Sequence, residues 1–150
     1  MLFTVHNQDG DNPTAVIEDV EFRGIEVVNS GGGFNIYASD NINPSDNMKR
    51  LYIHDNIVNV NGKDLNDNYG LTQRAVQIGQ GDTNKSSLDL VLDHNTFIIE
   101  SLATSNSMYL GAGTAKHSRT NIRNNLFEAV TSGVGADSQV EGQCGAKLGS

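Results

Sequence analysis

The sequence predicts an all-β chain built from about four stacked coils, and two observations carry this prediction. A phrase of the form apolar, polar, polar, Asn, any residue, apolar occurs four times, at spacings of 36, 39 and 30 residues. Turn-forming residues are abundant, with 18 Asn and 16 Gly in 150 residues. Such self-similarity is typical of repeat proteins, in which each repeat packs only on its neighbours. The four copies are Ile17–Phe22, where Val20 replaces the Asn, Ile53–Val58, Leu92–Phe97 and Ile122–Phe127.

Within each copy the alternation of apolar residues indicates a strand, and the polar pair that follows indicates a sharp bend. Stacking the copies aligns like side chains in columns, because strands in adjacent coils lie ~4.8 Å apart. Asn tolerates positive φ and its amide can bond to a stacked Asn, so we expect a ladder of Asn56, Asn95 and Asn125. The predicted apolar columns are Ala15, Leu51, Leu90 and Thr120; Ile17, Ile53, Leu92 and Ile122; and Phe22, Val58, Phe97 and Phe127.

A second strand is predicted after each phrase, over residues 34–37, 76–78, 108–110 and 134–136. The segment 2–5 has the same pattern, so the chain is expected to begin in mid-coil. Polar loops are expected at 39–49, 61–74 and 79–87, and one domain over 1–142 with a flexible tail at 143–150. Alternation predicts an inward set, Phe34, Ile36, Val76, Ile78, Met108 and Leu110, and an outward set, Asn35, Gln77 and Tyr109.

Composition narrows the function only slightly. A formal charge of −8 argues against a nucleic-acid partner, since phosphates require stripes of Lys and Arg. There is no apolar run of the length of a membrane helix and no secretion-signal pattern at the start, so no membrane partner is expected and the cellular compartment is open. Cys144 is the single cysteine and cannot form an intramolecular disulfide.

The outward positions of the phrase also stack. The second place brings Glu18, His54, Asp93 and Arg123 into one column, and the third place brings Asp19, Asp55, His94 and Asn124 into another. The favoured interpretation is a surface charge ladder beside bend residues that cap backbone amides. The alternative is a catalytic face, with His54 as a base oriented by Asp93, or with two stacked carboxylates at a spacing that suits a retaining glycosidase or a calcium ion.

Two loops are rich in oxygen ligands, residues 63–68 and 9–12, but neither has the spacing of an EF-hand. Solvated turns are favoured there, so no metal or other cofactor is expected, with calcium as the alternative. The run Gly31–Gly33 is not followed by a helix signal and is interpreted as a flexible turn rather than a phosphate loop.

Four stretches give the chain a resemblance to a known family: Leu2–Gly10, Val16–Arg23, Asp93–Thr96 and Arg123–Asn125. It resembles the right-handed parallel β-helix proteins, the fold of pectate lyases, and within them large uncharacterised β-helix proteins of environmental bacteria. The resemblance extends to about Gly142. Those proteins are longer, so the chain looks like an interior slice of such a protein. The resemblance also implies an extracellular location for those longer proteins.

The resemblance also implies where catalytic residues would lie. Pectate lyases use an Arg base with calcium-bound carboxylates, and polygalacturonases use grouped Asp residues with a Gly-His-Gly segment. The sequence has neither: no His lies between two glycines, and no acidic constellation matches Arg50, Arg74, Arg119 or Arg123. No catalytic residue can therefore be transferred from the family to this chain.

Three functions remain open. The preferred one is a non-catalytic module, with carbohydrate as its expected ligand through Asn35, Tyr52, Gln77 and Tyr109. The second is a polysaccharide lyase or glycoside hydrolase, or a fragment of one, with His54, Asp55 and Asp93 as candidates. The third is a purely structural assembly unit. Open coil ends further predict a homodimer, formed through Leu2–Val5 or through the Phe127 end.

Overall fold

The computed structural model describes residues 2–4, 9–37, 43, 45–60, 74–78, 88–99, 106–111, 117–128 and 132–136, with the backbone alone at 2–4, 88, 106 and 132–136. All of its secondary-structure elements in these ranges are strands. They are β1 (Leu2–Thr4), β2 (Glu18–Arg23), β3 (Glu26–Ser30), β4 (Phe34–Tyr37), β5 (Lys49–His54), β6 (Ile57–Val60), β7 (Val76–Ile78), β8 (Leu88–Asp93), β9 (Thr96–Ile99), β10 (Asn106–Leu110), β11 (Asn121–Arg123), β12 (Leu126–Glu128) and β13 (Ser132–Ala136).

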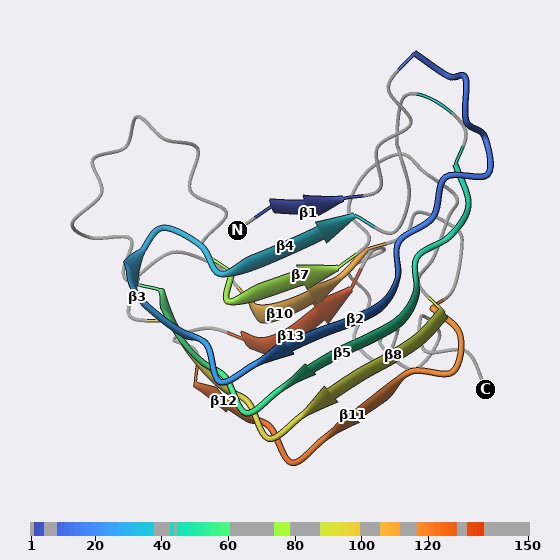
Figure 1. Cartoon of the computed structure of the whole chain (residues 1–150). Coiled ribbons are helices and arrows are strands. Elements are labelled where there is room, and N and C mark those ends of the chain that lie inside the picture. The colour runs from blue at the N-terminus through green and yellow to red at the C-terminus, as the bar shows by residue number, and fades with distance from the viewer. Residues whose placement is uncertain are drawn as a thin grey trace.

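These strands form three parallel sheets. Sheet A has the order β1-β4-β7-β10-β13, sheet B the order β11-β8-β5-β2, and sheet C the order β12-β9-β6-β3. Successive strands enter successive sheets, so β2-β3-β4, β5-β6-β7, β8-β9-β10 and β11-β12-β13 are the first to fourth coils. Figure 1 shows the sheet B strands side by side, each followed by a sharp bend into sheet C. The all-β prediction is confirmed, and the arrangement is consistent with a parallel β-helix.

Several predicted elements agree with the structure. The strands predicted after each phrase are β4, β7, β10 and β13, and the inward set in sheet A is buried throughout. Strand β1 pairs with β4, with Leu2 opposite Asn35, so it is the counterpart of β4 as expected. Residues 38–42, 61–73, 79–87 and 137–150 lie outside the described ranges, and so do the parts of the predicted loops and tail that fall there.

Each coil has three strands where the sequence predicted two. The bend between sheets B and C takes only two residues, such as Asp55 and Asn56 between β5 and β6. In a sequence, a bend this short looks like an interruption within one strand. The prediction therefore assigned the residues of the sheet C strands to the end of the repeated phrase and not to separate strands.

The predicted alignment of the first copy is wrong. The register places Val20 opposite Leu51 and Phe22 opposite Ile53, so Ala15 and Ile17 do not lead the apolar columns. Equivalent positions in successive coils are 31, 39 and 30 residues apart. The first coil bends at Gly24-Ile25, where the second coil has Asp55-Asn56. Because the true bend of the first coil lacks Asp and Asn, the repeated phrase matched the upstream segment Ile17–Phe22 instead. The other three copies align as predicted.

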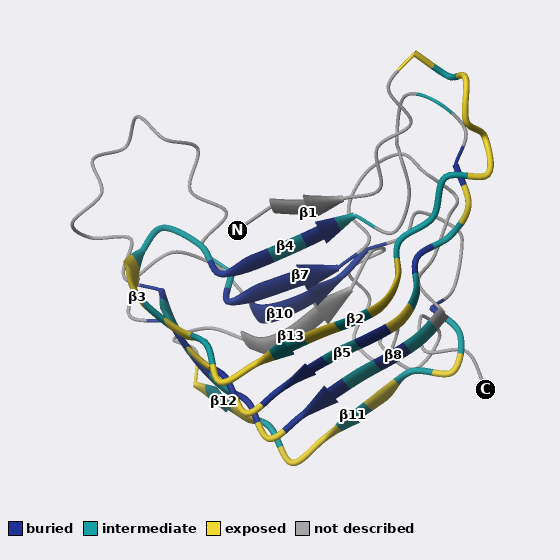
Figure 2. Ribbon diagram, viewed as in Figure 1, coloured by how far each residue is buried: buried dark blue, intermediate teal, exposed yellow. Residues whose placement is uncertain are grey.

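The core runs through the middle of the stack as columns of apolar side chains. Figure 2 shows the central strands β5, β8, β7 and β10 largely buried, whereas β2 and β11 carry exposed residues. Phe97 is fully buried, and its ring lies 5.4 Å from that of Phe127 in the next coil. Phe22 and Phe127, in the first and fourth coils, are only half-buried.

The prediction of a flexible turn at Gly31–Gly33 is wrong for Gly33. This residue is buried, and its N–H donates to the Arg74 carbonyl over 2.9 Å. A Cβ at this position would overlap the Ala75 carbonyl oxygen and the Val58 side chain. Glycine is therefore required here because the second coil approaches closely.

Candidate functional site

The candidate site lies where sheet B bends into sheet C, and it begins with a left-handed residue in every coil. The φ angles are 64° at Gly24, 54° at Asp55, 51° at His94 and 55° at Asn124. Asp and Asn adopt this conformation more readily than most residues, and Gly does so without steric cost. The repeated bend places one Asn directly above the next.

The predicted Asn ladder is confirmed. Asn56 Nδ2 donates to Asn95 Oδ1 over 2.9 Å, and Asn95 Nδ2 donates to Asn125 Oδ1 over 2.9 Å. Each Oδ1 also accepts the backbone N–H of the preceding Asn, while Asn95 Nδ2 donates to the Ile53 carbonyl. Asn56 and Asn95 are each only 1% exposed, so the ladder supplies hydrogen bonds that water cannot supply there.

The first coil joins this ladder without an amide of its own. Ile25, and not Val20 as predicted, occupies the Asn position. Its N–H donates to Asn56 Oδ1 over 2.9 Å, and the Phe22 carbonyl accepts from Asn56 Nδ2 over 3.0 Å. The Asn56 side chain therefore holds the backbone of the first coil's bend.

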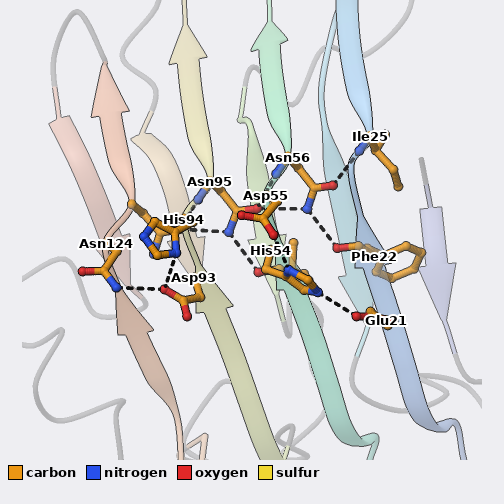
Figure 3. Close-up of polar contacts among 12 residues, drawn as sticks. Glu21, Phe22, Ile25, His54, Asp55, Asn56, Asp93, His94, Asn95 and Asn124 are labelled. Carbon is orange, nitrogen blue, oxygen red and sulfur yellow. Dashed lines mark hydrogen bonds and ion pairs between the residues drawn. The ribbon is translucent and has the colours of Figure 1, made fainter.

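His54 lies on the outer face of β5, where both ring nitrogens contact carboxylates (Figure 3). Nε2 is 2.7 Å from Glu21 Oε1 in the first coil, and Nδ1 is 2.8 Å from Asp55 Oδ2. The ring stacks on Tyr52 at 4.0 Å and the residue is only 8% exposed. Glu21 raises the pKa of His54, with Asp55 adding to the effect, and His54 lowers the pKa of Glu21.

The predicted orientation of His54 by Asp93 is wrong, because Asp93 is engaged elsewhere. Its Oδ2 accepts from Arg123 Nε over 2.9 Å, its Oδ1 accepts from Asn124 Nδ2 over 3.0 Å, and His94 Nδ1 lies 3.4 Å away. Arg123 holds the pKa of Asp93 below its usual range. Asp93 is 6% exposed rather than a solvated surface charge, because the long Arg123 side chain lies against it.

A second left-handed column was missed in the sequence. Near the start of each sheet B strand one residue has φ between 52° and 58°, and the charges of these residues alternate from coil to coil: Asp19, Arg50, Asp89 and Arg119. Arg50 binds Asp19 through two nitrogens, at 2.5 and 2.8 Å, and Glu18 at 2.7 Å. Arg119 likewise binds Asp89, with one contact of 2.7 Å.

These Arg contacts lower the pKa values of Asp19 and Asp89. Asp19 is thus a partner of Arg50 and does not stack on Asp55, so the predicted pair of stacked carboxylates is wrong. Alternation of acid and base at the true repeat spacing was the signal that could have revealed this column. The misaligned first copy concealed it.

The proposed sugar-binding residues are in different environments. Gln77 is 1% and Tyr109 9% exposed, although both lie on the outward side of sheet A. Gln77 Nε2 donates to Asn35 Oδ1 over 3.1 Å, Arg74 donates to Gln77 Oε1, and the Arg74 guanidinium lies 3.9 Å from the centre of the Tyr109 ring. Only Asn35 and Tyr52 of the four are partly exposed.

The oxygen-rich segment 9–12 includes Asn12, whose Oδ1 accepts from the Thr14 hydroxyl over 3.1 Å. Within the described ranges, no three His, Cys, Asp or Glu side chains gather as metal ligands. Segment 63–68 lies outside those ranges. The described residues also include no helix that is long and apolar enough to cross a membrane.

The fold and the site together define a class: an all-β protein of three parallel sheets, whose amide and charged side chains pair from one coil to the next. No family model, curated protein or solved structure matches the chain.

Proposed function

We propose that the chain is a non-catalytic β-helix module, in which the polar outer face of sheet B holds the coils together. The observation that carries this proposal is the engagement of His54 by two carboxylates, from Glu21 and Asp55. An ionised carboxylate only accepts hydrogen bonds, so both contacts are satisfied together when both ring nitrogens carry protons. A doubly protonated imidazole has no free lone pair with which to act as a general base.

The carboxylates support the same proposal. A glycosidase acid must keep its proton near neutral pH, which requires a raised pKa. Hydrogen bonds from His54 and Arg123 instead lower the pKa values of Glu21 and Asp93. The lyase or hydrolase alternative, with His54, Asp55 and Asp93 as its candidates, is therefore the less favoured one.

Activity assays separate these alternatives. The purified chain would be incubated with plant, algal and bacterial polysaccharides, and both reducing ends and unsaturated products would be measured. We expect no turnover. Turnover by the wild type that is lost in Asp55→Ala and in His54→Gln, with both variants folded, would contradict the proposal.

Carbohydrate binding without turnover stays a prediction of the same proposal. Tyr52 is its best-placed aromatic residue, because its ring is partly exposed on sheet B and is held by stacking on His54. Retardation in polysaccharide-containing gels would test it, with Tyr52→Ala as the variant and Tyr37→Ala, a partly exposed tyrosine of sheet A, as the control. Equal retardation of both variants would exclude Tyr52 as the contact, and absence of retardation by the wild type would favour a purely structural unit.

A further inference from the structure

Two side chains of β5 cross outward to β2 and hold the first coil against the second. Arg50 reaches Glu18 and Asp19, and His54 reaches Glu21 over 2.7 Å. Arg50 keeps its charge at every pH that a folded protein meets. His54 differs, because imidazole has an ordinary pKa of about 6.5 and changes charge near neutrality. Near neutral pH the Arg50 contacts between the first and second coils are therefore independent of pH, whereas the neighbouring His54 contact depends on it.

We propose that His54 is a pH-sensitive clasp between the first and second coils, closed when the imidazole is doubly protonated and opened when it loses a proton. The clasp stands on geometry: one ring nitrogen binds Asp55 in its own coil and the other binds Glu21 in the neighbouring coil. The Tyr52 ring, stacked on the imidazole, holds its orientation. Loss of either proton turns one nitrogen lone pair toward a carboxylate oxygen, which repels it.

Other titratable or charged groups around His54 come from every neighbouring strand. Strand β2 contributes Glu21 and Arg23, β5 and its bend contribute Tyr52 and Asp55, and β8 contributes Asp93. Arg123 and His94 both contact Asp93 rather than His54. Of these groups only His94 is another imidazole, so His94 is the group whose effect an experiment must separate from that of His54.

The sign of the pH dependence follows from the direction of the shifts. The pKa of His54 is raised by Glu21, so its contribution to stability is complete below about pH 6.5 and is lost as the pH rises through the folded-state value. The pKa of Glu21 is lowered by His54, so its contribution is complete above about pH 4.3 and is lost as the pH falls through its folded-state value. The clasp is therefore closed in mildly acid solution and opens toward alkaline pH.

Hydrogen exchange of the β2 backbone amides tests the clasp in the intact chain. Protection factors, corrected for the intrinsic pH dependence of exchange, would be measured by NMR from about pH 6 to about pH 9. We expect protection of β2 to fall across this range, by up to about tenfold for each unit by which the folded-state pKa of His54 exceeds the unfolded-state value. The β11 amides, whose coil is held by Arg119 and Arg123, should show no such step.

Matched variants identify the residue whose titration causes the fall in β2 protection, referred to here as the step. His54→Gln should abolish it, His94→Gln should keep it, and Arg50→Gln should lower β2 protection equally at both ends of the range. A step that persists in His54→Gln, or one that vanishes in His94→Gln, would overturn the proposal. If His54→Gln does not fold, NMR titration of the wild-type imidazole decides: a midpoint above that of a free histidine with both nitrogens protonated supports the clasp, and a midpoint at or below it refutes the clasp.

Discussion

Asn95 is the central residue of the amide ladder. Its side chain makes four hydrogen bonds: it donates to Ile53 and Asn125, and it accepts from the backbone and the side chain of Asn56. Of these partners Ile53 and Asn56 are buried, and Asn125 is half-buried. The planar amide of Asn95, in the third coil, is therefore hydrogen-bonded to both the second and the fourth coils.

Replacing Asn95 with Ala should lower the free energy of unfolding by about 1 to 3 kcal/mol, because buried donors and acceptors would lose their partners. Denaturant melts would measure the change. Asn125→Ala is the matched control, since Asn125 is only half-buried and contacts one neighbouring coil. A loss at Asn125 as large as that at Asn95 would contradict the role given to burial.

The left-handed bend residues show how far residue-level reasoning reaches. The pairs Asp-Asn, His-Asn and Asn-Asn are enough to predict three of the four bends and the whole amide ladder from the amino-acid sequence. Gly24-Ile25 performs the same turn without either signal, because Gly reaches φ of 64° at no steric cost and the Ile25 N–H needs only the Asn56 oxygen below it. The contact of His54 with Glu21 was not predictable, since it depends on the correct register of β2.

At the scale of elements, Gly33 controls how closely β4 and the second coil approach each other. Gly33→Ala should destabilise the fold by about 1 to 3 kcal/mol, because the added methyl group must displace backbone at Ala75. Gly24→Ala is the control: its Cβ would meet no atom within 4 Å, so only the cost of the left-handed conformation remains, about 1 to 2 kcal/mol.

Denaturant melts give the stability change for both glycines, and hydrogen exchange locates it. For Gly33→Ala the loss of protection should centre on β4 and β7, which are paired. For Gly24→Ala it should centre on β2 and β3. Loss confined to β2 in both variants would show that close approach at Gly33 is unimportant.

Strands were predictable where apolar and polar side chains alternate. They were not predictable where the chain passes from sheet B to sheet C within two residues. Strands β4, β7 and β10 were found where predicted, and the register stacks Asn35, Gln77 and Tyr109 in one column, although burial alternates only in β4. Sheet C was missed because its strands begin immediately after the bend. Burial of Gln77 was also unpredictable, because the residue is covered by tertiary contacts that alternation cannot show.

For the whole molecule, the described ion pairs divide the stack. Arg50 and His54 join the first coil to the second, and Arg119 and Arg123 join the third to the fourth. The second and third coils meet through the Asn56–Asn95 amides, the apolar columns and a longer-range attraction between Arg50 and Asp89, without a direct ion pair among the described residues. Salt should therefore weaken the two outer junctions more than the central one.

A homodimer is the expected assembly. Apolar side chains of the first and fourth coils, such as Phe22 and Phe127, are half-buried where their inner counterparts are fully buried. A second copy that covers them would stabilise the fold by mass action. Sedimentation at micromolar concentration should show about twice the 16.1 kDa chain mass, with stability that falls on dilution. A 16.1 kDa species whose stability is independent of concentration would refute the dimer.

The amide ladder also has a direction. The side-chain oxygens of Asn56 and Asn95 accept from the coil before, and their amide nitrogens donate to a carbonyl of that coil and to the side-chain oxygen of the next Asn. Consider a duplicated segment of 30 to 39 residues whose sheet B strand is followed by a left-handed residue and then Asn. The Asn of such a segment would form the ladder hydrogen bonds to the coils on both sides of it. Tandem duplication can thus lengthen such a chain from within, one coil at a time, without any change to the bends that already exist.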